Sequence, residues 1–188
     1  GLIHGVIGKN GAGKTVLLRL LCGLMHPSKG QVIVDGKQLG KDVDFAPDAG
    51  IIIETPCFLP YLSGFQNLKE LASIRNIISK EEIAEAMEQV KLDPSSRKHV
   101  GKYSLGMRQR LGIAQAIMER PRYLILDEPM NGLDTQGMED VRELLQKQKE
   151  TGVTVILASH SMEDIRLLCD TVHRIQDASL IPCTTEFS

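Results

Sequence analysis

The residues best suited to chemistry stand together near the start of the chain. Residues 8–15 read GKNGAGKT, a full match to the pattern G-x-x-x-x-G-K-[ST], between an expected strand and an expected helix. The three glycines let the backbone wrap until several N–H groups point at one anion, and the helix N-terminus adds its positive dipole end. Lys14 would bring a charge to the β- and γ-phosphates, and Thr15 a hydroxyl to Mg²⁺. The pattern predicts a nucleoside triphosphate site.

Two adjacent acids end an apolar run further along the chain. Residues 123–129 read YLILDEP, so that Asp127 and Glu128 follow an expected strand. Because successive side chains of a strand point to opposite faces, the two acids are expected to do different tasks. Beside a phosphate loop, one can hold Mg²⁺ and the other can orient or deprotonate the attacking water. A solvated acidic turn, with Pro129 simply ending the strand, is the alternative.

The elements that must position these residues alternate along the chain. Short apolar runs alternate with helical periodicity, which predicts an α/β fold with a mainly parallel sheet. The turn Asp35-Gly36 suggests a hairpin. We expect strands at 2–7, 123–126 and 153–157, and helices at 14–22, near 137–150 and from 161 onward.

The middle of the chain has a different texture. Ser79 followed by Glu82 forms a capping-box pattern ahead of an apolar helical stripe. Ser104 then opens a second helical stretch, ended by Pro121. We therefore expect one domain over residues 1–188, with an α/β core at 1–62 and 120–188 and an inserted helical subdomain at about 63–119.

Composition excludes several classes of protein. A net charge of -2, 4% aromatic residues and no Trp disfavour a nucleic-acid binder. No apolar run approaches the roughly 18 residues that would span a bilayer, so membrane association would come through a partner. The four cysteines lack metal-site spacing, and we expect them to be reduced.

Taken together, these residues resemble the nucleotide-binding domain of ATP-binding cassette (ABC) transporters over essentially the whole chain. GKNGAGKT resembles Walker A, and YLILDEP resembles Walker B with its catalytic acid. YSLGMRQRLGIAQAI at 103–117 resembles the family signature, NGLD at 131–134 the D-loop, and LASHS at 157–161 the segment of the switch histidine. Five motifs in the family's order are far more specific than any one alone. The resemblance implies a P-loop NTPase core with an inserted ABC-type helical subdomain.

The resemblance also implies a role for each matched residue. Lys14, Glu128 as general base and His160 at the γ-phosphate would form the catalytic group. A lone histidine after an apolar strand is more often structural, and the functional interpretation of His160 depends on its place in the motif order. Thr15 and Asp127 would hold Mg²⁺. ATP would be bound by Gly8, Lys9, Asn10, Gly11, Ala12, Gly13, Lys14, Thr15 and Val16.

The signature would act on a second copy of the domain. Its residues Ser104, Leu105, Gly106 and Met107 would meet the γ-phosphate held by a partner, which requires two domains head to tail with two ATPs between them. Asp134 would communicate across the same seam. Without the other motifs, a plain capped helix would be the preferred interpretation of Ser104.

The sequence departs from the family pattern at three positions. Leu105 replaces a glycine and adopts a left-handed backbone less easily, and Met107 cannot donate the amide of the usual glutamine. Gln109 is nearby but out of register. Glu54 stands where the Q-loop glutamine belongs, and we hypothesise that it is a Mg²⁺-linked, partner-coupled residue. A solvated loop acid is the alternative for Glu54.

The segment before the phosphate loop is shorter than in the family pattern. The sequence begins seven residues before Gly8, whereas family members carry further strands and an adenine-stacking aromatic ahead of Walker A. We therefore expect an N-terminally truncated domain that binds ATP weakly. No residue of this sequence can be assigned the stacking role.

The resemblance implies an ATP-binding and ATP-hydrolysing subunit, peripheral on the cytoplasmic side of a membrane, that works through a separate transmembrane permease. The stretch IIIETPCFLPYLSGFQNL at 51–68 and the motif SLGMRQR resemble those of bacitracin-resistance and lantibiotic-immunity exporters, so a peptide antibiotic or similar substrate is the expected cargo. A non-transport ABC ATPase of translation or DNA repair is an alternative, although those relatives usually carry tandem cassettes or coiled-coil insertions. A small-molecule P-loop kinase would leave the signature, D-loop and His160 unexplained.

Overall fold

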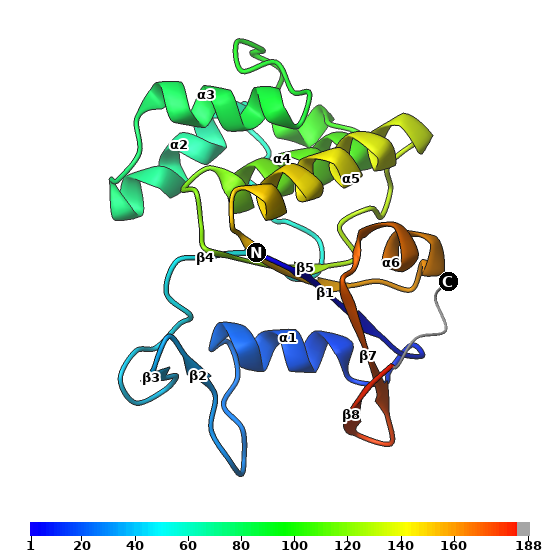
Figure 1. The fold of residues 1–188 in the computed structure, drawn as a ribbon. Coiled ribbons are helices and arrows are strands. Elements are labelled where there is room, and N and C mark those ends of the chain that lie inside the picture. The colour runs from blue at the N-terminus through cyan, green and yellow to red at the C-terminus, as the bar shows by residue number, and fades with distance from the viewer. Residues whose placement is uncertain (184–188) are drawn as a thin grey trace.

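A computed structural model describes residues 1–183. Its centre is a six-stranded sheet with the order β4-β5-β6-β1-β7-β8, shown in Figure 1. All neighbouring strands are parallel except β8, which runs antiparallel to β7. The strands are β1 (Ile3–Ile7), β4 (Ala49–Ile52), β5 (Tyr123–Asp127), β6 (Thr154–Ala158), β7 (Thr171–Gln176) and β8 (Ser179–Pro182). The predicted α/β fold with a mainly parallel sheet is confirmed.

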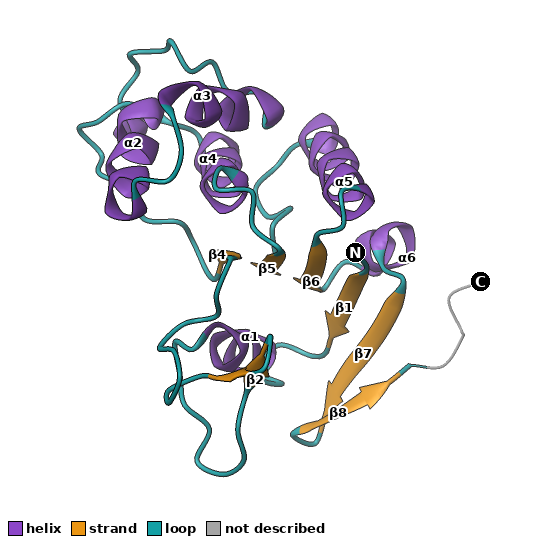
Figure 2. Ribbon diagram, turned by 60° about the vertical axis from the view of Figure 1, so that its left-hand side comes forward, coloured by secondary structure: helices purple, strands orange, loops and turns teal. Residues whose placement is uncertain are grey.

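Helices cover both faces of this sheet. Figure 2 shows α1 (Lys14–Cys22) on one face, with the small hairpin of β2 (Ile33–Val34) and β3 (Lys37–Gln38) beside it. The opposite face carries α2 (Gly64–Arg75), α3 (Lys80–Gln89), α4 (Leu105–Ile117), α5 (Thr135–Glu150) and α6 (Met162–Leu168). A single 3-10 turn at Val100–Lys102 precedes α4. None of the helices within residues 1–183 has both the length and the apolar composition needed to cross a bilayer.

Local sequence explains where the helices of the middle segment begin. Ser63 and Ser79 each accept a hydrogen bond from the amide three residues later, and their own amides donate to the side-chain oxygens of Gln66 and Glu82, respectively. Each reciprocal pair satisfies two amides that would otherwise lack partners. The capping box at Ser79 matches the sequence pattern, and the one at Ser63 marks the start of the helical stretch at residue 63.

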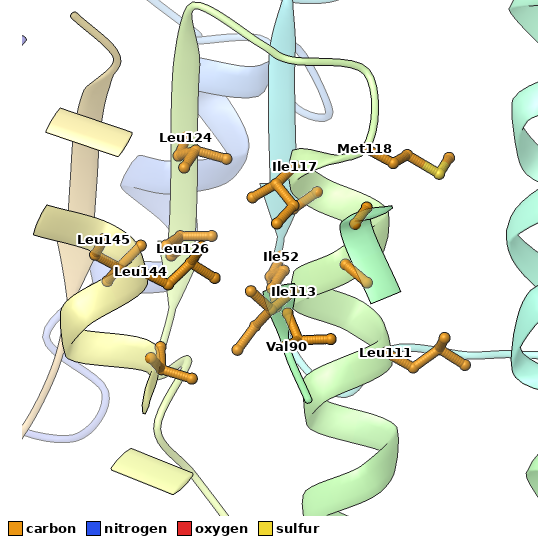
Figure 3. Close-up of a cluster of buried hydrophobic side chains, with 14 of the residues drawn as sticks. Ile52, Val90, Leu111, Ile113, Ile117, Met118, Leu124, Leu126, Leu144 and Leu145 are labelled. Atoms are coloured by element: carbon orange, nitrogen blue, oxygen red, sulfur yellow. The ribbon is translucent and has the colours of Figure 1, made fainter. Parts of the chain in front are cut away.

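One hydrophobic cluster joins the middle segment to the sheet. In Figure 3, Leu124 and Leu126 of β5 face Ile113 and Ile117 of α4, with Leu144 and Leu145 of α5 on the other side. The α4 backbone also lies directly on β4, because a side-chain carbon at Gly50 would lie 1.9 Å from the Ala116 carbonyl oxygen. The helical segment shares the core of the sheet, and its division from the core at residues 63 and 119 stays a prediction.

The parallel arrangement fixes where the candidate functional residues meet. β1, β5 and β6 run in one direction, with Asp127 paired to Ala158 at the carboxyl ends of β5 and β6. The loops that follow these three strands therefore share one edge of the sheet. The phosphate loop (residues 8–13), the Asp127-Glu128 pair and His160 all lie at this edge.

Candidate nucleotide site

The phosphate loop ends in an uncapped helix N-terminus. Gly11 and Gly13 have φ values of 78° and 105°, in the left-handed region that glycine adopts without strain. Gly13 precedes α1 and provides no side-chain cap. Within the described residues, the amides of Lys14, Thr15 and Val16 make no hydrogen bond to a backbone carbonyl. Unpaired amides at the positive end of a helix form a binding site for an anion.

Lys14 and Thr15 turn toward the same edge of the sheet. Lys14 is 8% exposed, and its Nζ donates to the Gly8 carbonyl oxygen at 2.9 Å. Thr15 Oγ1 donates to Asp127 Oδ2 at 2.6 Å, across 112 positions of sequence. The structure thus brings together the hydroxyl and the carboxylate to which a magnesium role was assigned.

Glu128 and Asp127 differ in backbone conformation, which corrects the sequence argument. Glu128 lies beyond the end of β5 with φ at 51°, so strand alternation does not separate the two acids. The left-handed turn is anchored by the Glu128 amide, which donates to the Ala158 carbonyl at 2.9 Å. This turn places the Glu128 carboxylate beside His160, and His160 Nδ1 lies 2.7 Å from Glu128 Oε2. An ionised carboxylate can only accept, so Glu128 in that form would take this hydrogen bond from a proton on Nδ1.

The segment that carries His160 is held from behind. Ser161 caps α6 by accepting from the Asp164 amide, and its own amide donates to Ser159 Oγ at 3.1 Å. The Asp164 carboxylate is 2% exposed and accepts from Arg142 of α5 at 2.9 and 2.6 Å. A buried, hydrogen-bonded ion pair therefore fixes α6 to α5 directly behind the histidine.

The phosphate loop, the loop after β4 and the Asp127-Glu128 pair line a cavity of about 600 Å³, here called the nucleotide cavity. Acidic, basic and amide side chains all reach it. It is lined by Lys9, Asn10, Gly11, Gly13, Lys14, Thr15, Val16, Glu54, Thr55, Leu105, Gln109, Asp127, Glu128 and Asn131. A second cavity of about 700 Å³ lies on the His160 side of the phosphate loop, between the loop and β7. The phosphate loop forms the shared wall of the two.

The signature segment (residues 103–107) begins α4. Ser104 is its N-cap and accepts from the Met107 amide at 3.2 Å, as its sequence position suggested. Leu105 is the first helical residue and does not have a positive φ. The expected backbone penalty for replacing glycine there is therefore absent. Gly106 packs against the D-loop, where an added side-chain carbon would lie 3.0 Å from the Gly132 carbonyl oxygen.

Two residues near the cavity carry interactions that the sequence analysis missed. Gln109 is buried, and its amide donates to the Pro129 carbonyl at 3.0 Å, which links α4 to the turn after β5. Arg19 of α1 contacts Glu54 at 2.5 Å. The sequence did contain a signal for both: Gln109 lies one helical turn beyond Leu105, and Arg19 lies one helical turn beyond Thr15.

Asp134 lies outside the nucleotide cavity of its own chain. It is the N-cap of α5, and Oδ1 accepts from the Gly137 amide at 2.8 Å. Its role across a dimer seam stays a prediction.

An uncapped strand–loop–helix phosphate cradle, joined to a strand-end aspartate by a threonine hydroxyl, defines a P-loop nucleoside triphosphatase. The ABC transporter family model matches residues 1–131. The ABC transporter ATP-binding protein YybJ of Bacillus subtilis is 46% identical over 170 residues, which are 90% of this chain and 78% of YybJ. The chain belongs to the ABC transporter family, as an ATP-binding subunit.

A second relative and a solved structure agree with this assignment. The bacitracin transport ATP-binding protein BcrA of Enterococcus faecalis is 40% identical over 96% of this chain, which spans 59% of BcrA. A solved ATP-binding subunit of an ABC transporter is 26% identical, with a TM-score of 0.84 over 95% of this chain and 76% of its own. The predicted family, including its bacitracin-type relatives, and the predicted cassette fold are confirmed.

Proposed function

We propose that the chain binds Mg²⁺ and ATP in the nucleotide cavity and hydrolyses the γ-phosphate bond. The observation that carries this proposal is the Thr15–Asp127 hydrogen bond of 2.6 Å at the uncapped start of α1, in the cavity that Glu128 also lines. Mg²⁺ prefers oxygen ligands and keeps several waters and substrate oxygens, so one hydroxyl and one carboxylate suit it. When bound there, it would offset the negative charge of the phosphates.

The residues of this chain supply position and charge. Lys14 Nζ would exchange its bond to the Gly8 carbonyl for phosphate oxygens, as the free loop amides close on the same anion. The Glu128 carboxylate would accept a proton from the attacking water. His160, held 2.7 Å from it, would orient that carboxylate and contact the γ-phosphate.

A second cassette would complete the site. Ser104 and Leu105 are exposed at the start of α4, and Gly106 is half-buried beside them, so the first amides of this helix suit a phosphate presented by a partner. In a head-to-tail dimer, each nucleotide would lie between one phosphate loop and the other signature segment. Glu128→Gln should then form a dimer with ATP and Mg²⁺ on size exclusion and remain a monomer without them.

Export of a peptide antibiotic through a transmembrane permease is the transport function that we propose. The support is the similarity to BcrA, whose name records bacitracin transport, together with the sequence wording of residues 51–68. The chain would then lie on the cytoplasmic side of the membrane through its permease. A non-transport ABC ATPase is the second candidate, and co-purification with ribosomes or DNA in place of a membrane protein would favour it.

A further inference from the structure

Arg19 and Glu54 form an ion pair at the rim of the nucleotide cavity. Arg19 Nη2 lies 2.5 Å from Glu54 Oε1. Glu54 lies just after β4, and its φ of 64° is in the left-handed region that non-glycine residues seldom adopt. Arg19 stands one turn beyond Thr15 on α1, the helix that begins at the phosphate loop. The pair therefore joins the loop after β4 to the phosphate-binding helix.

The balance of charges in the cavity indicates why this ion pair matters for binding an anion. Glu54, Asp127 and Glu128 bring three carboxylates to a cavity that would accept an anionic triphosphate. The cations that line the same cavity are Lys9 and Lys14. An uncompensated third carboxylate would repel the phosphates over several ångströms in this partly enclosed space.

We propose that Arg19 is a positioning residue that neutralises Glu54 and holds its carboxylate against α1, so that the site accepts an acid at this position. The inference rests on the proposed function of the cavity. The side chains of Arg19 and Glu54 are 38% and 63% exposed. Exposed ion pairs contribute little to folding, so the pair should affect nucleotide binding far more than stability.

Calorimetry with the non-hydrolysable ATP analogue AMP-PNP and Mg²⁺ tests the proposal without turnover. Arg19→Gln should weaken AMP-PNP binding about tenfold. The same change in a Glu54→Gln background should weaken it about twofold or less. Arg19→Lys keeps the charge and should bind nearly as the unmodified protein does. The melting temperature should stay nearly constant throughout.

Arg75→Gln is a matched control. Arg75 is 49% exposed and pairs with Glu119 at 2.7 Å, away from the nucleotide cavity, so its loss should not change AMP-PNP binding. The inference is overturned if Arg19→Gln weakens binding equally with and without Glu54→Gln, or does not weaken it at all. Lys14→Ala separates the two claims: normal binding by Lys14→Ala contradicts the proposed function itself, whereas loss of binding there with no coupling between Arg19 and Glu54 contradicts this inference alone.

Discussion

At the scale of single residues, the polar groups of the nucleotide cavity are fixed by partners distant in sequence. Thr15 bonds to Asp127 across 112 positions, and Glu128 contacts His160 across 32. The first bond joins the start of α1 to the end of β5, and the second joins the turn after β5 to the loop after β6. The chemistry of the cavity therefore depends on the sheet that aligns these ends.

Replacing the Thr15 hydroxyl tests the proposed magnesium site. Thr15→Val keeps the shape of the side chain but removes the donor to Asp127, and we expect Mg²⁺-dependent phosphate release to fall by roughly a hundredfold. Thr15→Ser retains the hydroxyl and should keep most of the activity. Equal activity of the Val and Ser variants, measured as phosphate release against Mg²⁺ concentration, would argue against a role for the hydroxyl.

The cysteines should differ sharply in reactivity. Burial raises the pKa of the Cys22 thiol to about 12, and burial with nearby Asp170 and Asp164 raises the pKa of Cys169 to about 12. Because the thiolate is the nucleophile, both should stay protonated and unmodified by iodoacetamide at pH 8, while the exposed Cys57 reacts. Peptide mass spectrometry before and after unfolding checks this. Modification of Cys22 at the rate of Cys57 in the folded protein would contradict it.

Sequence motifs predicted the residues of the cavity better than its internal contacts. The run GKNGAGKT and the acids after YLIL carry their chemistry in residue type and spacing, so they were found directly. The contacts of Arg19 with Glu54 and of Gln109 with Pro129 depend on how α1 and α4 pack, which no local pattern encodes. The turned backbone of Glu128 was missed for the same reason.

At the scale of elements, the signature segment and the D-loop of one chain lie in contact. Gly132 has φ at 76°, and a side-chain carbon there would lie 2.5 Å from the Leu105 side chain. The large Leu105 side chain therefore fits because Gly132 has no side chain. Any side chain at 132 must push Leu105 away from its place at the cavity.

Gly132→Ala tests this contact, and Gly152→Ala is the control for backbone strain alone. Gly152 has φ at 94° with open space around it, so Gly152→Ala carries the backbone strain of about 1–2 kcal/mol without the collision. We expect Gly132→Ala to lose at least as much free energy of unfolding as Gly152→Ala, because it adds the collision to the strain. Only Gly132→Ala should lower ATP hydrolysis, by about tenfold, because it displaces the signature segment. Urea unfolding and phosphate release measure the two effects. Equal activity of both variants would show that the contact has no functional role.

Elements with strong local signals were predicted, and those defined by tertiary pairing were not. The helix after the phosphate loop and the helix capped by Ser104 matched their sequence signals. β4 reads as Ala-Gly-Ile-Ile, with small residues that suit the close approach of α4 but give no strand alternation. β8 is exposed at all four positions and is defined only by its pairing with β7.

At the scale of the whole molecule, helices on one face of the sheet are locked to each other by a buried charge pair. Asp164→Ala would leave Arg142 largely buried beside α6 without its closest carboxylate, and we expect a loss of about 3 kcal/mol in the free energy of unfolding. Glu163→Ala removes a 72% exposed partner of the same arginine and should cost under about 1 kcal/mol. Urea denaturation compares the two. Equal losses would contradict a buried role for Asp164.

The most direct test of the central claim is phosphate release from ATP and Mg²⁺ by the protein and by Lys14→Ala. The Lys14 ammonium lies inside the phosphate cradle, bonded to the Gly8 carbonyl and almost fully buried. Loss of this charge from the phosphates should lower the rate by about a thousandfold. A saturable rate that disappears in Lys14→Ala is the predicted result, and an unchanged rate in that variant would contradict the account.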